Sequence, residues 1–208
     1  MTHDRPATLP PRWAESLLRL LLKPEDRDSV SGDLLEEYRE SIVPAVGRRA
    51  DRWYLRQVGW YLLRATWVWG LLVGGTLVIR YLFDTLVPTT DYVSRSVPMS
   101  RFIIAVSFLG AASTSVRTHS LSAGLIVGTL GGALGGAISI VGTALLLAIW
   151  HDADTLREWQ RSGGIDEALI AVPMIMVLVG AVMGAAGALC GKLPVTLYGL
   201  SRPDAKSA

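Results

Sequence analysis

A histidine and two aspartates stand close together in the segment "HDAD", and they are residue types that bind metal ions. The residues are His151, Asp152 and Asp154. Metal sites of this kind usually draw ligands from two separated clusters, and the sequence offers no second cluster. We therefore interpret the segment as part of a solvated acidic loop, and the sequence predicts no metal site.

Hydroxyl and thiol groups are also present, but the residues that would activate them as nucleophiles are not. Ser107, Ser113 and Ser115 have no histidine and carboxylate at a matching depth, so a catalytic triad is unsupported. His119 lies in a short polar connection and is interpreted as an interface or turn residue rather than a catalyst. Cys190, the single cysteine, lies in an apolar run and is expected to be a small packing residue. The sequence therefore predicts no enzyme, no catalytic residue and no cofactor, and an enzyme acting on lipids is the weakest alternative.

The composition is typical of a membrane protein with a polar head. Half of the 208 residues are hydrophobic, and the mean hydropathy is +0.38. More than half of the charged residues lie in the first 64 positions, and long segments after Trp67 carry no charge. We expect a cytoplasmic helical domain over 1–60, a transmembrane domain over 61–198 and a cytoplasmic tail over 199–208. No cleavable signal peptide is expected, because the first apolar stretch is short and broken by Arg19.

Four segments are candidates for crossing a bilayer, which takes about 20 apolar residues. They cover residues 61–87, 102–116, 121–150 and 168–191. The second is the shortest, and if it only re-entered the membrane the C-terminus would lie on the side that its charges disfavour. Basic residues before the first span and after the fourth, with an acid-rich 151–167 loop, predict that both termini are cytoplasmic. The expected fold class is an all-α polytopic membrane protein, with a four-helix transmembrane bundle and a small N-terminal helical domain.

Glycines recur along one side of the third and fourth spans. In the third span the small residues on one helical stripe are Gly124, Gly128, Gly131, Gly132, Gly135, Gly136, Ser139, Gly142 and Thr143. The opposite face carries Val127, Leu130, Leu134, Ile138, Val141 and Leu145 and is expected to face lipid. The fourth span repeats the pattern with Gly180, Gly184, Gly187 and Gly191, and Pro173 near its start leaves one backbone carbonyl without its helical donor.

Two interpretations of the glycine stripes stay open. Small residues let transmembrane helices approach closely, which predicts that the third and fourth spans pack against each other. Alternatively, the stripes of several copies surround a conduit. Ion pathways usually carry an ionisable residue at mid-membrane, and the third and fourth spans have none. Arg80 and Asp84, spaced to pair along one helix, lie near the outer end of the first span.

Residues 12–64 predict three amphipathic helices. Their expected apolar faces are Trp13, Leu17, Leu20 and Leu21 in the first, Val30, Leu34, Tyr38 and Ile42 in the second, and Tyr54, Val58, Tyr61 and Leu62 in the third. The second helix carries acids on its other face, and the third carries Arg48, Arg49, Arg52 and Arg56. These arginines either neutralise the acids inside the head or contact anionic lipid and leave the acids to a protein partner. No nucleic-acid partner is expected.

The runs "PRWAESLLRLLLKPEDRDSVSGDLLEEYRE" and "GRRADRWYLRQVGWYLLRA" carry a resemblance to a known module. Over residues 11–64 the chain resembles the permease prefix domain, which precedes the membrane part of duplicated FtsX-like permeases of the macrolide-exporter type. The resemblance implies a bacterial inner membrane and a cytoplasmic docking module. Those permeases carry large extracytoplasmic domains and more spans, and they work with a separate ATPase. In this chain we expect no large outer domain, and the sequence shows no GxxxxGK[ST] phosphate loop of an ATPase. The sequence thus predicts a non-enzymatic docking component of a transport or signalling complex; the alternative is a small homo-oligomeric transporter or channel.

Overall fold

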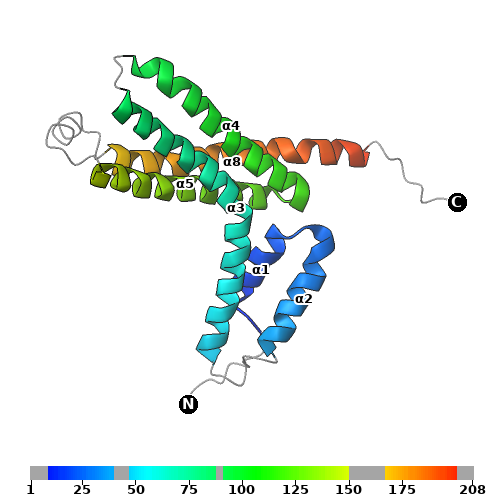
Figure 1. The fold of residues 1–208 in the computed structure, drawn as a ribbon. Coiled ribbons are helices and arrows are strands. Elements are labelled where there is room, and N and C mark those ends of the chain that lie inside the picture. Colours follow the sequence, from blue (N-terminus) through cyan, green and yellow to red (C-terminus); the bar gives the residue numbers. More distant parts are fainter. Residues whose placement is uncertain (1–8, 40–46, 88–90, 150–166, 201–208) are drawn as a thin grey trace. The chain divides into compact units, whose positions relative to one another are not determined.

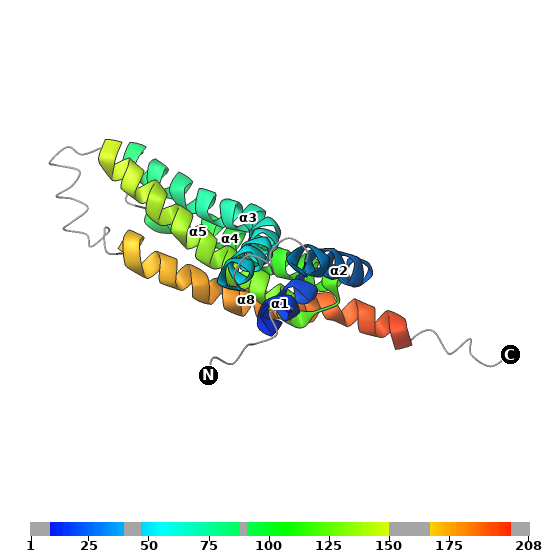
Figure 2. The same ribbon diagram turned by 90° about the horizontal axis from the view of Figure 1, so that it is seen from below.

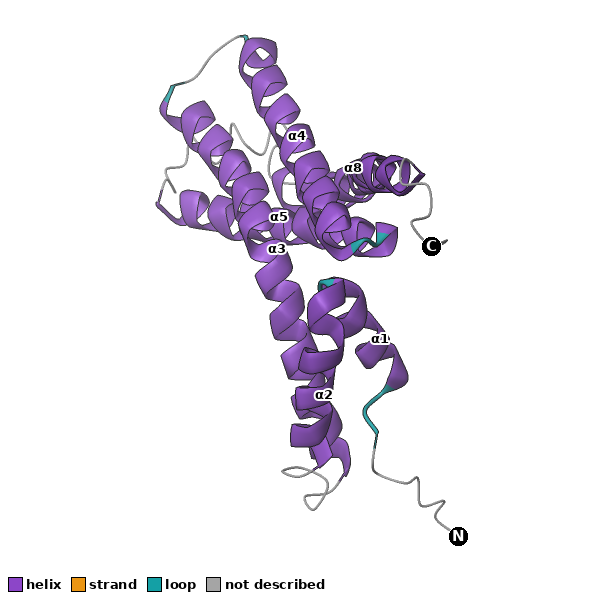
Figure 3. Cartoon of the chain, turned by 90° about the vertical axis from the view of Figure 1, so that its right-hand side faces the viewer, coloured by secondary structure: helices purple, strands orange, loops and turns teal. Residues whose placement is uncertain are grey.

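The computed structural model describes residues 9–39, 47–87, 91–149 and 167–200 (Figure 1). All of its regular elements in these ranges are helical, as the secondary-structure colouring of Figure 3 makes plain. The α-helices are α1 (Arg12–Leu21), α2 (Arg27–Glu37), α3 (Gly47–Leu86), α4 (Tyr92–Thr118), α5 (Leu121–Ile149) and α8 (Val172–Leu200). A short 3-10 turn, Pro24–Asp26, precedes α2, and a π-helical segment, Glu167–Ala171, precedes α8. The all-α fold class is confirmed.

Four helices are long and apolar enough to cross a membrane. The spans are Ala50–Leu86, Val93–Thr118, Leu121–Ile149 and Leu169–Lys192. The second is longer than the sequence predicts, because the helix continues through Pro98 and its polar neighbours toward Tyr92. All four predicted spans therefore correspond to helices of sufficient length, and the chain is a membrane protein by this measure.

The described chain divides into two compact units. The first comprises Met1–Ala65 together with Arg117–His119, and the second comprises Thr66–Val116 and Ser120–Ala208. The boundary falls inside α3, which runs without interruption from Gly47 to Leu86.

The first unit has a core built by α1, α2 and the beginning of α3. Its buried residues are Ala14, Leu18, Leu22, Leu34, Tyr38, Ala50, Tyr54 and Val58. The predicted faces of the second and third helices are confirmed where described, whereas Ile42 lies outside the described residues. The predicted face of the first helix is wrong by one position: Ala14 and Leu18 are fully buried, and Trp13 is 62% exposed. The small Ala14 side chain permits a close approach that the large tryptophan would prevent.

The second unit is a bundle in which α4, α5, α8 and the part of α3 after Ala65 lie side by side (Figure 2). Its apolar core contains Val73, Leu77, Tyr81, Ile103, Val106, Leu146 and Val172. Many large apolar side chains point outward instead, among them Phe102, Leu145 and Leu178. Such an outward apolar surface suits helices whose solvent is lipid.

Candidate functional site

A close helix contact in the bundle joins α5 to α8 through glycines. A Cβ atom added to Gly128 would lie 2.6 Å from the Cα of Gly184, and one added to Gly132 would collide with the backbone carbonyl oxygen of Met176. A Cβ atom added to Gly136 would lie 3.0 Å from the Cα of Pro173. Because these glycines face backbone rather than flexible side chains, a larger residue would have to separate the helices.

Three further glycines of α5, Gly131, Gly135 and Gly142, face α3, whereas Gly124 faces α4 and α8. An added Cβ on Gly135 would lie 2.5 Å from Val73, and one on Gly74 of α3 would lie 2.6 Å from Ile138. Likewise, a Cβ on Gly70 would lie 2.6 Å from the Leu134 side chain. The broad glycine stripe of α5 therefore contacts three helices, α3, α4 and α8.

These contacts correct the predicted lipid face of the third span. Val127 is fully buried, while Leu134 and Ile138 pack against the glycines of α3. Leu130 and Leu145 are exposed as predicted, at 38% and 59%. The prediction was wrong for Leu134 and Ile138 because Gly70 and Gly74 of α3 accept these large side chains, which helical periodicity within α5 cannot reveal.

The C-terminal glycines of α8 contact α4. Gly187 faces the carbonyl of Phe108, and a Cβ on Gly191 would lie 2.6 Å from the carbonyl oxygen of Ala112. Beside them, the Oγ of Ser115 donates a buried hydrogen bond of 3.0 Å to the carbonyl oxygen of Ala188. Ser115 thus has a structural role in joining two helices.

The other residues that the sequence offers as candidates for chemistry bond within their own helix, are exposed, or lie outside the described residues. Ser113 donates to the carbonyl of Gly110 within α4, at 3.0 Å. Cys190 is exposed on α8, so the prediction that it packs inside is wrong; it follows Leu189, which is also turned outward. The "HDAD" segment, residues 151–154, lies outside the described residues. Among the residues that the structure describes, no three histidine, cysteine or acidic side chains gather to hold a metal ion.

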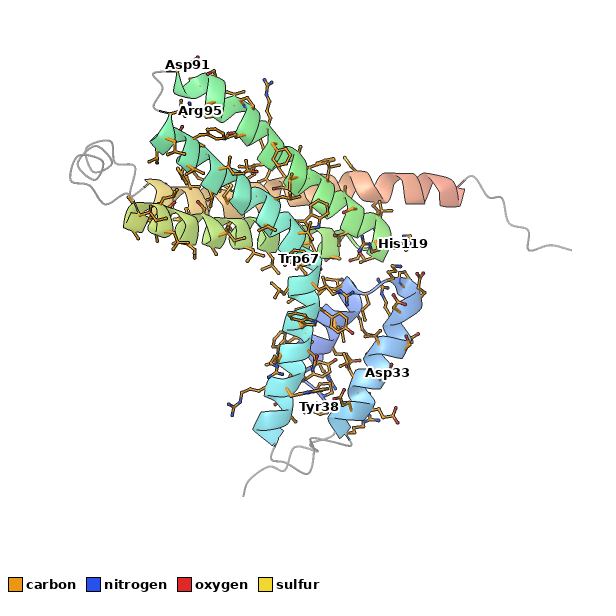
Figure 4. All side chains as sticks on the ribbon, in the orientation of Figure 1. Asp33, Tyr38, Trp67, Asp91, Arg95 and His119 are labelled. Carbon is orange, nitrogen blue, oxygen red and sulfur yellow. The ribbon has the colours of Figure 1, made fainter. Side chains whose placement is uncertain are left out.

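An ion cluster joins the end of α3 to the start of α4. Arg95 donates from Nη1 to Oδ1 of Asp84 at 2.8 Å and from Nη2 to the carbonyl of Val87 at 3.0 Å. The predicted pair of Arg80 with Asp84 also forms, at 3.6 Å. Asp91 caps the start of α4 by accepting a hydrogen bond from the backbone N–H of Ser94, and Figure 4 shows Asp91 and Arg95 on this end of the helix.

Two hydroxyl groups on α5 are fully buried and have no hydrogen-bond partner within the described ranges. They belong to Ser139 and Thr143, both 0% exposed. Thr129 and Thr76, in contrast, donate to the carbonyl four residues earlier in their own helices, at 2.9 and 2.7 Å. A buried polar group without a partner costs about 1–3 kcal/mol. Sequence reasoning placed both residues on the small-residue stripe but gave no sign that their hydroxyls would lack partners.

In the first unit, the turn after α4 is held by α2. Arg27 donates from Nη2 to the carbonyl oxygen of Thr118 at 2.7 Å. His119 follows with a positive φ of 53°, the left-handed conformation that reverses a chain after a helix. His119 is therefore a turn residue, as predicted. Ser120 then caps α5, because its Oγ accepts a hydrogen bond from the backbone N–H of Ala123 at 3.3 Å.

A polar contact in the head joins the residue that follows α2 to α3. The hydroxyl of Tyr38 donates to Oδ1 of Asp51 at 2.8 Å, and its ring meets the Tyr54 ring edge-on at 5.9 Å. Burial, followed by the hydrogen bond to Asp51 and the charge of that carboxylate, raises the pKa of Tyr38 to about 12. Tyr38 thus remains neutral at physiological pH.

The outer face of α2 is acidic. Asp33, Glu36 and Glu37 are exposed, and none of them forms a salt bridge with another described residue. Asp33 is labelled on this face in Figure 4. The one described inter-helix ion pair of the head joins Arg19 of α1 to Asp28 of α2, at 2.6 Å. The acids of α2 therefore stay available at the surface.

Neither a family model, nor a curated protein, nor a solved structure matches this chain. The resemblance of residues 11–64 to the permease prefix domain consequently stays a prediction that rests on the sequence runs alone.

Proposed function

We propose that the chain is a non-enzymatic component of a transport or signalling complex, and that its head docks a cytoplasmic protein partner. In this proposal the chain resides in a bacterial inner membrane, with both termini in the cytoplasm. The resemblance to the permease prefix domain supports a docking head, and the distribution of basic residues supports the orientation.

The acidic face of α2 is the observation that carries this proposal. Asp33, Glu36 and Glu37 are exposed on the side away from the core residues Leu34 and Tyr38. If the arginines of α3 neutralised these acids inside the head, salt bridges would join the two groups, and none is formed between the described residues. We therefore favour a basic protein surface as the partner of this face.

A second contact, with anionic lipid, fits the beginning of α3. Arg52 and Arg56 are exposed, and Trp60 follows with 61% of its surface exposed. Arginine near a membrane surface contributes about 1 kcal/mol of attraction to anionic lipid, and tryptophan favours the interface. The side chains of Arg48 and Arg49 lie outside the described residues.

The alternative, a homo-oligomeric transporter or channel lined by glycine, is less well supported. Gly128, Gly132 and Gly180 are used in contacts between α5 and α8 of the same chain. A glycine that is buried between two helices of the same chain has no free surface with which to line a pore. The docking proposal is therefore preferred.

Affinity purification of the full chain in mild detergent tests the docking proposal. The matched variant reverses the α2 face (Asp33→Lys, Glu36→Lys, Glu37→Lys), and the control reverses Asp28, which is engaged with Arg19. We expect a co-purifying cytoplasmic chain with the parent and the control but not with the triple variant. Recovery of only further copies of this chain would favour the channel instead. Reporter fusions test orientation: those after 117 and 202 should read cytoplasmic, and those within 89–96 and 154–163 external.

A further inference from the structure

A positive charge stands on an apolar, outward-facing side of α4. Arg101 is exposed, and its neighbours one helical turn away, Val97, Ile104 and Ala105, are exposed as well. Arg101 forms no salt bridge with an acidic side chain among the described residues. A charge on a lipid-facing helix costs free energy unless the side chain reaches the headgroup region. What Arg101 reaches therefore depends on how deep in the bilayer it lies.

The uncharged stretch of α4 is shorter than an ordinary bilayer is thick. Fifteen uncharged residues separate Arg101 from Arg117 in α4, and fifteen separate Arg64 from Arg80 in α3. Such a stretch of helix is about 22 Å long, against about 30 Å for the hydrocarbon of a typical bilayer. Two successive helices thus have the same deficit.

Arg80 and Arg101 mark one boundary of this short stretch at nearly the same level. Two contacts fix the register of the antiparallel helices α3 and α4: Trp69 with Gly110, and Asp84 with Arg95. Fifteen residues separate the two contacts on each helix, so the register holds between them. In this register the levels of Arg80 and Arg101 differ by two residues, which is about 3 Å along a helix. Arg80 is paired with Asp84 of its own helix, at 3.6 Å, whereas Arg101 has no such partner among the described acids.

The other two spans do not demand a thicker bilayer. α5 has 29 residues without a charge, which corresponds to about 43 Å of helix. Long apolar helices fit a thin bilayer by tilting. α5 and α8 cross α4 obliquely in Figure 1, so α4 can stand steeply in the bilayer while α5 and α8 tilt.

We infer that the bilayer is thin along the exposed face of α4, and that Arg101 binds the phosphate of a lipid headgroup there. The guanidinium group can donate two parallel hydrogen bonds to phosphate oxygens. A thin hydrocarbon layer brings that phosphate within reach of the arginine, while the exposed apolar residues beside Arg101 contact the acyl chains. The ligand is thus a phospholipid, recognised by its phosphate and by the thickness of the bilayer that it forms.

The experiment measures the melting temperature of the full chain in nanodiscs, by circular dichroism. The nanodiscs contain phosphatidylcholine and phosphatidylglycerol whose monounsaturated acyl chains have fourteen, sixteen, eighteen or twenty carbons. Mismatch between helix and bilayer destabilises the folded chain, so we expect the highest melting temperature in the two shorter lipids. From there to the longest lipid it should fall by roughly 5–10 °C. A melting temperature that is constant, or highest in the longest lipid, would overturn the inference.

Substitutions at Arg101 separate lipid binding from helix packing. Arg101→Leu lengthens the apolar stretch, so its highest melting temperature should move to a longer lipid. Arg101→Lys can also reach the headgroup and should keep the profile of the parent. The control Arg95→Gln breaks the pair with Asp84 and should lower the melting temperature by a similar amount in every lipid.

Two results would overturn the role of Arg101. One is an unchanged profile in Arg101→Leu. The other is a change in the number of copies per nanodisc without a shift of the profile, which would indicate that Arg101 meets an acidic side chain of a second copy. Either result is independent of the docking proposal, which concerns the head.

Discussion

Ser115 and Ala188 join α4 to α8 by a side-chain hydrogen bond inside the membrane bundle, with the serine Oγ 3.0 Å from the alanine carbonyl oxygen. Both residues are 1% exposed, and the contact lies beside the glycine approach of Gly187 and Gly191. Hydrogen bonds between transmembrane helices contribute about 0.6–2 kcal/mol.

Ser115→Ala should therefore lower the free energy of unfolding by about 0.6–2 kcal/mol. The loss would appear as a lower midpoint in a denaturant titration of the detergent-solubilised chain. Ser113→Ala is the control, because Ser113 bonds within its own helix and is exposed. Equal losses for the two variants would contradict the inter-helix role of Ser115.

Gly132→Leu should destabilise the chain by about 1–3 kcal/mol, because its side chain would meet the Met176 backbone. Gly184→Leu should do the same on the facing helix, and thermal unfolding in detergent measures both. Leu130→Ile is the control. Leu130 is 38% exposed, and this substitution exchanges one lipid-facing alkyl group for another. Unchanged stability in both glycine variants, together with loss of a solute leak in reconstituted vesicles, would instead indicate a conduit.

Arg95→Gln and Asp84→Asn should show coupled losses of stability. Their side chains are each 20% exposed, so the pair is less screened than a surface ion pair, and we expect a coupling free energy of about 1–2 kcal/mol. A double-mutant cycle in detergent measures it. Arg101→Gln serves as the reference, because Arg101 is an exposed arginine of the same helix that pairs with no described acid. If the losses of stability in the two single variants simply add in the double variant, the interaction between Arg95 and Asp84 is contradicted.

The stability of the head should fall as the pH rises from about 10 to about 12. The pKa of Tyr38 is raised to about 12 in the folded chain against 10.0 when unfolded, so neutral Tyr38 stabilises the fold fully below pH 10. That contribution is lost as the pH passes the folded pKa. Circular dichroism of the parent and Tyr38→Phe over this range measures the effect. Tyr38→Phe should be about 1 kcal/mol less stable at neutral pH and show a weaker alkaline decline.

Sequence periodicity predicted the helices and their membrane class, but it did not identify their partners. The stripe of α5 was visible, whereas its division between α8 and α3 depends on Gly70 and Gly74, which lie in another helix. The face of α1 was misassigned because hydropathy favours large side chains, and the buried residue there is Ala14.

The contacts of the candidate sites depend on packing between separate segments. Asp84 and Arg95 are eleven positions apart on two helices, so no helical spacing reveals their pairing. The unpartnered hydroxyls of Ser139 and Thr143 likewise follow from side-chain orientation, since other threonines in the spans bond to their own helices.

The docking of a partner on the acidic face of α2 is tested most directly by photo-crosslinking in intact cells. A photoreactive residue placed at Glu36, which is exposed, should form a crosslink to a second, different protein chain. The same residue placed at Leu178, which is 63% exposed on α8, should react with lipid instead. Reversal of Asp33 and Glu37 to lysine should abolish the crosslink at position 36. A position 36 that reacts only with water, with lipid or with another copy of this chain would contradict the account.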